Sequence, residues 1–559
     1  MKKYNRLFLL AFILLLNSLF LISAANANEQ IKLVLQITVD GFRGDLLTRY
    51  KHHYGVHGFR YLLDHGVYYA NAHYSHANTD SVVGHATLAS GSYPADHGMI
   101  GNIWLDPDSG KQVNNVEDIN SPLLAVTDLL PDNQAVSQER ISGRSPKAML
   151  ATTFSDQLFI NTAGRSRVFA VSAKDYAAIL MSGHMGKAFW FSGATANMVS
   201  STYYYDSYPE WVSQWNAQKL PNRYAQTSWE LSNNREQYLF SEQDDRPYEV
   251  DLNGFSRTFP HPYGDLDKPL FSTLLTAGPA GDELVADFAK ALIANETLGS
   301  RIPTDYLSVS FSSLDTSNHL FGPSSLESED IIAHLDKTLA DLLQFIDKQI
   351  GLENTLIVLS ADHGMPEAAE YITELGFPAG QISSDEISAA ANAIGKKEFG
   401  IEGVVKAFIR PFIYLDETKI KLTKLTLKNV ATHIAKALND LEGIGFSVAK
   451  SGLPALTDNP IAQQIKRNFH AQRAGDIYIA QAPYWLLQET NEDAVMNGSP
   501  WSYDTYVPIL FAGANLKAQR IDRRVHPVDI AATLATLMSV TPPSNARGSV
   551  LEEVASQRP

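Results

Sequence analysis

The sequence predicts an α/β fold: a large, mostly parallel sheet sandwiched by helices, with a smaller α+β lobe inserted into it. Short apolar runs, rich in Val, Ile and Leu, recur along the 559 residues and are typical of buried strands. Segments with helical spacing lie between these runs. This alternation of strand and helix patterns favours a parallel sheet covered on both faces.

Five apolar runs are expected as buried parallel strands, and one long amphipathic helix is expected at 329–348, where Ile and Leu side chains fall on one face. Each run is short and bounded by polar residues. The expected strands are 33–39, 168–172, 306–311, 355–360 and 507–512.

The alternating pattern is interrupted at 370–490, where mixed helix and strand patterns predict the inserted lobe. The catalytic domain is then expected to consist of residues 28–369 and 491–559. Within it, residues 185–265 carry many aromatic side chains and few regular patterns. Packing inside a long insertion is the simpler interpretation of this segment, and a substrate-facing cap is the alternative.

Residues 1–27 have the composition of a signal peptide. A basic start precedes an apolar stretch, and Ala25–Ala27 provides a small-residue cleavage site. An uncleaved membrane anchor is the alternative, but Asn17 and Ser18 interrupt the apolar run. We therefore expect cleavage before Asn28, no stable membrane anchor afterwards, and a periplasmic or secreted enzyme.

Composition excludes several classes of function. The formal net charge of −16 argues against a nucleic-acid partner, because a phosphate backbone requires a basic surface. The chain has no cysteine, so disulfides and thiolate catalysis are excluded. Any bound metal must use His, Asp, Glu, Asn or hydroxyl ligands.

Polar side chains follow four of the expected strands where each strand ends: Asp40, Lys174, Asp315, and the pair Asp362 and His363. In open α/β sheets the ligand crevice lies at the carboxyl ends of the strands. Each residue alone has an ordinary explanation as a turn or capping residue. Their repeated position predicts one site assembled from distant segments.

The residue types at this expected site suit a metal ion. Asp315 and His319 are four residues apart, so on a helix they share a face and can bind one cation. Asp362 and His363 are adjacent at a strand end, and Asp40 adds a third carboxylate. Mixed carboxylate and imidazole ligands suit zinc, and also manganese or iron.

Ser81 begins an apparent helix in the segment 78–91. A serine at this position is most often an N-cap. It can also be a nucleophile, because the amides of a helix N-terminus bind phosphate and a metal cation can hold the hydroxyl as an alkoxide. The two roles are compatible.

Nine motifs, in order along almost the whole mature chain, resemble the alkaline phosphatase superfamily. The sequence is most similar to the single-chain, phosphate-irrepressible alkaline phosphatases of bacteria, with nucleotide pyrophosphatase/phosphodiesterases as cousins. The motifs are VDGFRGDLLTRY (39–50), SVVGHATLASGSYPADHGMIGNIW (81–104), VSAKD (171–175), FWFSG…SSTYYY (189–205), LDTSNHLFGP (314–323), LSADHG (359–364), RAGDIYI (473–479), YDTYVPILFAG (503–513) and HPVDIAATLATL (526–537).

The resemblance implies two zinc ions about 4 Å apart that bind the attacking and leaving oxygens of an in-line displacement. It implies that the nucleophile lies four residues before His85, at Ser81 and not at Thr79. It implies that Asn102 binds a phosphate oxygen and that Lys174 stabilises the transferring phosphoryl group. The implied metal ligands are Asp40, Asp362, His363 and Ser81 for one ion, and Asp315, His319 and a late His for the other.

The chain departs from the family pattern at three positions. Ser81 replaces a threonine, which keeps the hydroxyl. Tyr176 stands where the family pattern has an arginine, and a tyrosine cannot form a bidentate phosphate contact. Asn497 stands at the position of the late metal-binding His, and an amide is a poorer zinc ligand than imidazole. The last departure predicts a weak second zinc site.

These observations predict metal-dependent hydrolysis of small-molecule phosphate monoesters through a phospho-Ser81 intermediate. The first alternative is a phosphodiesterase or nucleotide pyrophosphatase, because Tyr176 removes a cationic contact that favours monoesters. The second is a catalytically degenerate protein that binds a phosphorylated ligand, which Asn497 favours.

Overall fold

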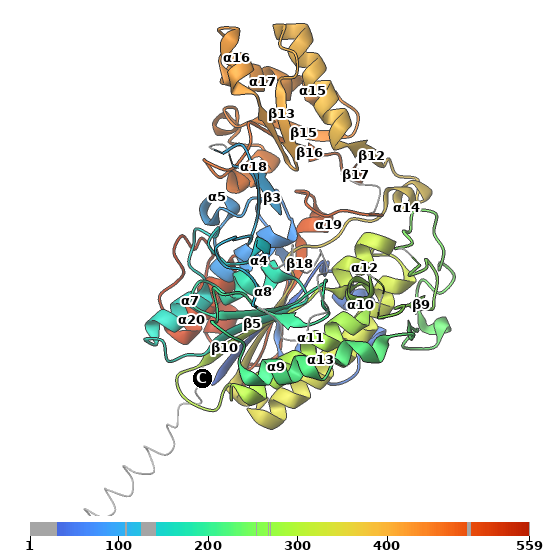
Figure 1. Ribbon diagram of the computed structural model, residues 1–559, viewed down its shortest axis with the longest axis vertical. Coiled ribbons are helices and arrows are strands. Elements are labelled where there is room, and N and C mark those ends of the chain that lie inside the picture. Colours follow the sequence, from blue (N-terminus) through green and yellow to red (C-terminus); the bar gives the residue numbers. More distant parts are fainter. Residues whose placement is uncertain are drawn as a thin grey trace, which may run out of the picture.

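The protein has a large α/β fold, as the sequence predicts, with helices on both faces of a nine-stranded sheet (Figure 1). The computed structural model describes residues 31–106, 109–124, 141–252, 254–266, 268, 270–488 and 493–557. The expected signal peptide, 1–27, lies outside the described residues. The strand order across the sheet is β19-β2-β18-β11-β1-β10-β5-β6-β7, where β19 is Gln519–Ile521, β6 is Lys187–Phe191 and β7 is Met198–Val199.

Four of the expected strands form the parallel centre of this sheet. β1 pairs with β10 on one side and β11 on the other, and β5 pairs with β10. Every residue of these four strands is buried, which explains why they read as continuous apolar runs. Their bounds are Leu33–Val39 (β1), Val168–Ser172 (β5), Asp305–Phe311 (β10) and Thr355–Ser360 (β11).

The fifth expected strand exists, but its predicted parallel direction is wrong. β18 (Tyr506–Gly513) pairs antiparallel with both β11 and β2 (Val67–His73). Nearly all of β18 is buried, and a fully buried run has the same apolar composition in either direction. As a consequence, β18 begins at the edge of the sheet where β11 ends.

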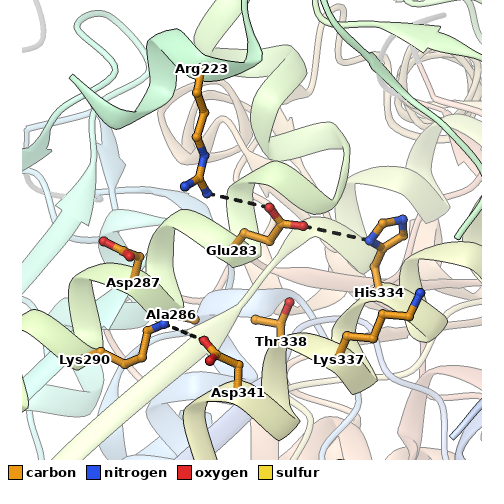
Figure 2. A pocket seen from close by; sticks show the side chains of 9 residues that line it. All are labelled: Arg223, Glu283, Ala286, Asp287, Lys290, His334, Lys337, Thr338 and Asp341. Atoms are coloured by element: carbon orange, nitrogen blue, oxygen red, sulfur yellow. Dashed lines mark hydrogen bonds and ion pairs between the residues drawn. The ribbon is translucent and has the colours of Figure 1, made fainter. Parts of the chain in front are cut away.

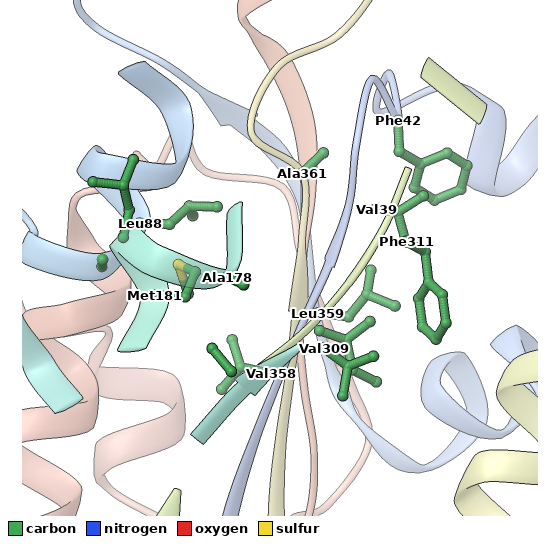
Figure 3. Packing of buried hydrophobic residues seen from close by; sticks show 14 of the residues in the cluster. Val39, Phe42, Leu88, Ala178, Met181, Val309, Phe311, Val358, Leu359 and Ala361 are labelled. Atoms are coloured by element: carbon green, nitrogen blue, oxygen red, sulfur yellow. The ribbon is translucent and has the colours of Figure 1, made fainter. Parts of the chain in front are cut away.

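The core fills both faces of the sheet. On one face α8 (Asp175–Ser182) packs against β5, and α4 (Ser81–Ser90) packs against α8. On the other face α11 (Pro279–Asn295) packs against β10 and against α13 (Leu326–Gln349), the helix expected at 329–348. Figure 3 shows Leu88 and Met181 on one side of the strands and Phe42 and Phe311 on the other.

A second, smaller sheet lies in the segment expected as the inserted lobe, at the top of Figure 1. Its four strands run in the order β13-β14-β16-β15, and α15 and α17 pack against it around a separate apolar cluster. The domain boundaries at 370 and 490 remain predictions. The bounds are Val405–Ile409 (β13), Phe412–Leu415 (β14), Ile444–Ala449 (β15), Ile477–Gln481 (β16), Ser384–Phe399 (α15) and Leu427–Leu438 (α17).

The aromatic-rich segment 185–265 packs against the body of the protein. Trp211 and Trp215 each lie with ring centroids 5.1 Å from that of Phe288 on α11. One residue of this segment, Leu252, reaches the site described below. Within the part of the chain that the structure describes, none of the helices combines the length and apolar character needed to cross a bilayer.

Candidate active site and metal centre

The polar residues expected at strand ends converge at one edge of the sheet. Asp40 directly follows β1, and Asp362 and His363 follow β11. Asp315 lies in α12 (Ser313–Phe321), the helix that follows β10. All four are almost completely buried. Parallel strands place their carboxyl ends together, so segments more than 300 residues apart meet here.

Three of these side chains form a compact group of possible metal ligands. The ligand atoms of Asp40, Asp315 and His363 all lie within 4.8 Å of one another. The Nε2 atom of His363 is 3.3 Å from Asp40 Oδ1 and 3.6 Å from Asp315 Oδ1. Asp362 Oδ2 is 3.5 Å from the same nitrogen. The group therefore presents carboxylate and imidazole atoms toward one shared space.

Both candidate histidine ligands are held in the tautomer that metal binding requires. His363 donates from Nδ1 to the carbonyl of Gly364 at 2.7 Å, and His319 donates from Nδ1 to the carbonyl of Val495 at 2.8 Å. A carbonyl can only accept, so Nε2 keeps its lone pair in the neutral ring. The Nε2 atom of His319 lies 3.6 Å from Asp315 Oδ2, one helical turn along α12.

Buried carboxylate oxygens without hydrogen-bond partners show that these residues fit a cation. Asp40 Oδ1 and Asp315 Oδ1 are buried, and neither of them accepts a hydrogen bond within the described part of the chain. A buried carboxylate is costly unless it is paired or coordinates a metal. The arrangement therefore fits a metal ion, but the ligand set does not by itself identify the metal.

Lys174 is the cation nearest to these carboxylates. Its Nζ atom lies 2.7 Å from Asp40 Oδ2 and 2.5 Å from Asp315 Oδ2. Burial alone would raise the pKa of Asp40, but Lys174 and His363 hold it well below its usual value. Burial and the charge of Asp40 raise the pKa of Asp362. The site thus combines strong negative charge with one fixed ammonium.

Ser81 is the first residue of α4, as the sequence indicated, and the alternative N-cap role is wrong, because Asp80 occupies the N-cap position. The Oγ atom of Ser81 lies 3.0 Å from His363 Nε2, at the candidate metal group. Thr79 instead donates its hydroxyl to the carbonyl of Ser499 at 3.0 Å. The geometry therefore brings Ser81, and not Thr79, to the place where a nucleophile would act.

A pocket of about 310 Å³ opens above this group. Seven of the residues singled out in the sequence line it, whereas Asp40, Asp362 and His363 lie buried and are not among its lining residues. The seven are Ser81, Asn102, Lys174, Tyr176, Asp315, His319 and Asn497.

Asn497, the residue at the position of the expected late histidine, lies in the pocket wall. Its Nδ2 atom donates to the carbonyl of Thr79 at 2.9 Å, which leaves only Oδ1 as a ligand atom. Tyr176 lines the same pocket from α8, with its ring 5.9 Å from Lys174 Nζ. Tyr176 thus lacks the charge, and Asn497 the imidazole nitrogen, that the family pattern has at these positions.

The sequence interpretation missed two residues that organise the site. His85 Nδ1 lies 2.9 Å from the carbonyl of Ser81 and 3.1 Å from Asp362 Oδ2, so it links the helix of the candidate nucleophile to the strand end. Its spacing of four from Ser81 was the signal, because i and i+4 lie on one helical face. Arg410 also lines the pocket, from the inserted lobe, and no motif near it indicated this.

A second pocket, formed by α11 and α13 with Arg223, lies on the helical face and holds mostly charged side chains (Figure 2). Its charges are largely paired: Lys290 lies 2.5 Å from Asp341, and Arg223 and His334 both approach Glu283. This pocket does not include the strand-end residues and has the character of a solvated surface.

Comparison with known proteins agrees with this geometry. Residues 34–507 match the model of the type I phosphodiesterase / nucleotide pyrophosphatase family. The chain is 32% identical to alkaline phosphatase PafA of Elizabethkingia meningoseptica, covering 95% of each chain. It is also 32% identical to alkaline phosphatase PhoV of Synechococcus elongatus, covering 94% of this chain and 92% of PhoV.

The fold agrees as well. The crystal structure of wild-type PafA superimposes with a TM-score of 0.87 at 30% identity, covering 95% of this chain and 100% of that one. The chain therefore belongs to the type I phosphodiesterase/nucleotide pyrophosphatase family and is a phosphoric ester hydrolase of the alkaline phosphatase type.

Proposed function

We propose that this enzyme hydrolyses phosphate monoesters through a covalent phospho-Ser81 intermediate. The observation that carries the proposal is the position of the Ser81 hydroxyl, 3.0 Å from His363 Nε2 and at the first residue of α4. A hydroxyl there lies beside both the metal-competent carboxylates and the amides of a helix N-terminus, which bind phosphate oxygens.

Two zinc ions are the cofactor that these ligands suit. Asp40, Asp362 and His363 would hold one ion together with Ser81, and Asp315, His319 and Asn497 would hold the other. Bound zinc would lower the pKa of the serine hydroxyl and neutralise charge on the phosphoryl oxygens. Because Asn497 offers only a neutral carbonyl oxygen, the second ion would be held more weakly.

The residues of the chain then perform two displacements. Ser81 gives up its hydroxyl proton to solvent, its Oγ attacks phosphorus, the bond from phosphorus to the leaving oxygen breaks, and the departing alkoxide takes up a proton from solvent. A water molecule next loses a proton to solvent and attacks the phosphoserine, the bond from phosphorus to Oγ breaks, inorganic phosphate leaves, and Ser81 Oγ takes a proton back from solvent. Lys174 and Asn102 line the same pocket as Ser81 and would hold the non-bridging oxygens in both steps.

A phosphodiesterase activity is the second candidate, and Tyr176 favours it. A monoester dianion gains more than a diester monoanion from each fixed positive charge, so a tyrosine in place of an arginine reduces monoester preference. The ratio of kcat/KM for a monoester to that for a diester of the same alcohol separates the two functions. A ratio well above one supports the monoesterase, and a ratio below one supports the diesterase.

The covalent intermediate has its own test. Acid quenching during turnover of a phosphorus-labelled monoester should trap label on a peptide that contains Ser81. A protein that hydrolyses the ester without ever carrying label would contradict the proposed intermediate. Metal analysis at saturating zinc should give two zinc ions per chain, whereas a degenerate binding protein would hold one or none.

Export to the periplasm or the medium is part of the same proposal. It rests on the composition of residues 1–27. N-terminal sequencing of the mature protein should begin at Asn28, and recovery of a chain that still begins at Met1 would contradict cleavage.

A further inference from the structure

The pocket receives a second cationic side chain from the inserted lobe. Arg410 lies in the turn between β13 and β14, and it is the one arginine among the described residues that line the pocket. Lys174 comes from a different part of the fold, where β5 leads into α8. Two separate parts of the fold therefore place positive charge at the same pocket.

Hydrogen bonds hold Arg410 next to the candidate nucleophile. Its Nη2 atom donates to Asp80 Oδ1 at 3.1 Å, and its Nη1 atom donates to the carbonyl of Asn497 at 2.6 Å. Asp80 directly precedes Ser81, and its other oxygen accepts from the backbone N–H of Asn102 at 3.2 Å. Asp80 thus connects the guanidinium to both Ser81 and Asn102.

The backbone beside Arg410 is shaped for close approach. Gly498 has a φ of +108°, and a Cβ atom there would lie 3.3 Å from Arg410 Cζ and 2.7 Å from Asp80 Oδ1. A side chain at 498 would therefore push against the ion pair as well as strain the backbone. Glycine at this position lets the segment lie against the guanidinium and fix its orientation.

A guanidinium fixed in this way suits a phosphoryl group. Arginine is always charged and binds phosphate oxygens through a planar set of donors, and prior ordering of the side chain reduces the entropy lost on binding. Arg410 is only 7% exposed, and it is one of the residues that line the pocket. Lys174 and Arg410 are both paired with carboxylates, Lys174 with Asp40 and Asp315 and Arg410 with Asp80, so each cation is held in position before a substrate binds.

We propose that Arg410 is a substrate-binding residue that contacts the transferring phosphoryl group and replaces the arginine missing at position 176. The proposal rests on the proposed phosphate-ester hydrolysis and deepens it, because it assigns monoester recognition to the inserted lobe. Tyr176 and Arg410 line the same pocket from different elements. In this chain the inserted lobe would therefore supply the guanidinium contact that the family pattern places on the helix after β5.

The test removes the guanidinium without leaving a buried carboxylate unpaired. The variant is the pair Arg410→Met and Asp80→Asn, with Asp80→Asn alone as reference and Arg410→Lys as a milder change. Arg473→Met is the matched control, because Arg473 is also partly buried, donates to a backbone carbonyl at Gly98, and is not among the pocket-lining residues. Melting temperatures establish that each variant is folded.

Two kinds of measurement are made on the whole enzyme: kcat/KM for para-nitrophenyl phosphate and for bis-para-nitrophenyl phosphate, and calorimetric binding of inorganic phosphate. Relative to Asp80→Asn, the double variant should lose about 10²-fold on the monoester and much less on the diester, as when one transition-state donor is removed. Phosphate binding should weaken, Arg410→Lys should give a smaller loss of the same kind, and Arg473→Met should leave the ratio of the two rates unchanged.

Equal losses on both esters with unchanged phosphate binding would overturn the proposal, because Arg410 would then only position Asp80. Adding Tyr176→Arg to the double variant should restore part of the monoester rate, and no recovery would also count against it. Wild-type protein that hydrolyses neither ester would instead refute the proposed function. Phosphate binding by the wild type and by the double variant would still test Arg410 in that case.

Discussion

Replacing Gly84 by alanine should push α4, the helix that begins with Ser81, away from Asp362 and His363, which follow β11. Gly84 lies on α4, one residue before His85, and a Cβ atom there would lie 2.0 Å from the carbonyl oxygen of Asp362. Ordinary contacts begin near 3.4 Å, so the helix or the strand end must move by about 1.4 Å. His363 directly follows Asp362, so this movement also changes the 3.0 Å separation of Ser81 Oγ and His363 Nε2.

The size of the effect follows from that displacement. A misplacement of about 1 Å between reacting groups costs on the order of 10² in rate. Overpacking of a buried site costs about 1–3 kcal/mol of stability, whereas alanine in place of a helical glycine would by itself stabilise by about 1 kcal/mol. We therefore expect Gly84→Ala to lower kcat/KM for para-nitrophenyl phosphate about 10²-fold and to lower the melting temperature.

The control is Gly193→Ala, because a Cβ atom at Gly193 would meet nothing within 4 Å and the backbone there does not need a positive φ. This exposed substitution should change activity and stability little, within about 0.5 kcal/mol. If Gly84→Ala keeps its activity within about threefold of the wild type and melts no lower, then helix propensity dominates. The close approach of α4 to Asp362 would then not position Ser81.

Four further outcomes follow from the same site and its surroundings. Ser81→Ala should lose several orders of magnitude in ester turnover while zinc content, measured by atomic absorption, is retained; near-normal turnover would exclude it as the nucleophile. Lys174→Ala should reduce kcat/KM for monoesters more than for diesters, and equal losses would mark Lys174 as structural. Asn497→His should raise zinc occupancy in calorimetric titration and turnover at limiting zinc, unless the natural chain already binds two ions tightly. Burial and Glu327 raise the pKa of Glu249 to about 9, so the folded state keeps a proton that the unfolded state loses near pH 4.5. The free energy of unfolding therefore falls as pH rises between these two values. Glu249→Gln should reduce the difference between the free energies of unfolding measured in urea at pH 5 and at pH 8, and an unchanged difference would contradict the assignment.

The sheet could be predicted well because its central strands are buried on both faces. β1, β5 and β11 were expected with the bounds that the structure has, and β10 begins one residue earlier. Burial determines composition, and composition is what a single sequence displays. The direction of β18 could not be predicted, because its apolar run carries no information about which end lies at the site.

The candidate site, like the sheet, could be predicted from the sequence only in part. Residues that follow strands, such as Asp40 and Asp362, could be placed from the sequence because the topology of an α/β sheet brings strand ends together. The position of Arg410 could not be placed in this way. It depends on how the inserted lobe packs on the body, and that packing arises from contacts between distant segments, such as Phe412 and Tyr478 joining the main apolar cluster.

The two neutral substitutions, Tyr176 and Asn497, are best understood together with Arg410. An active site for phosphate dianions needs positive charge that is fixed before substrate arrives. The helix after β5 supplies only Lys174, and the segment at Asn497 supplies a carbonyl that itself accepts from Arg410. The backbone of Asn497, the residue expected to weaken a second metal site, thus helps to hold the lobe's guanidinium in place. If Arg410 contacts the phosphoryl group as proposed, recognition of substrate charge depends on the packing of the lobe as much as on the strand ends. A substitution that loosens the lobe should then alter monoester preference before it alters the nucleophile.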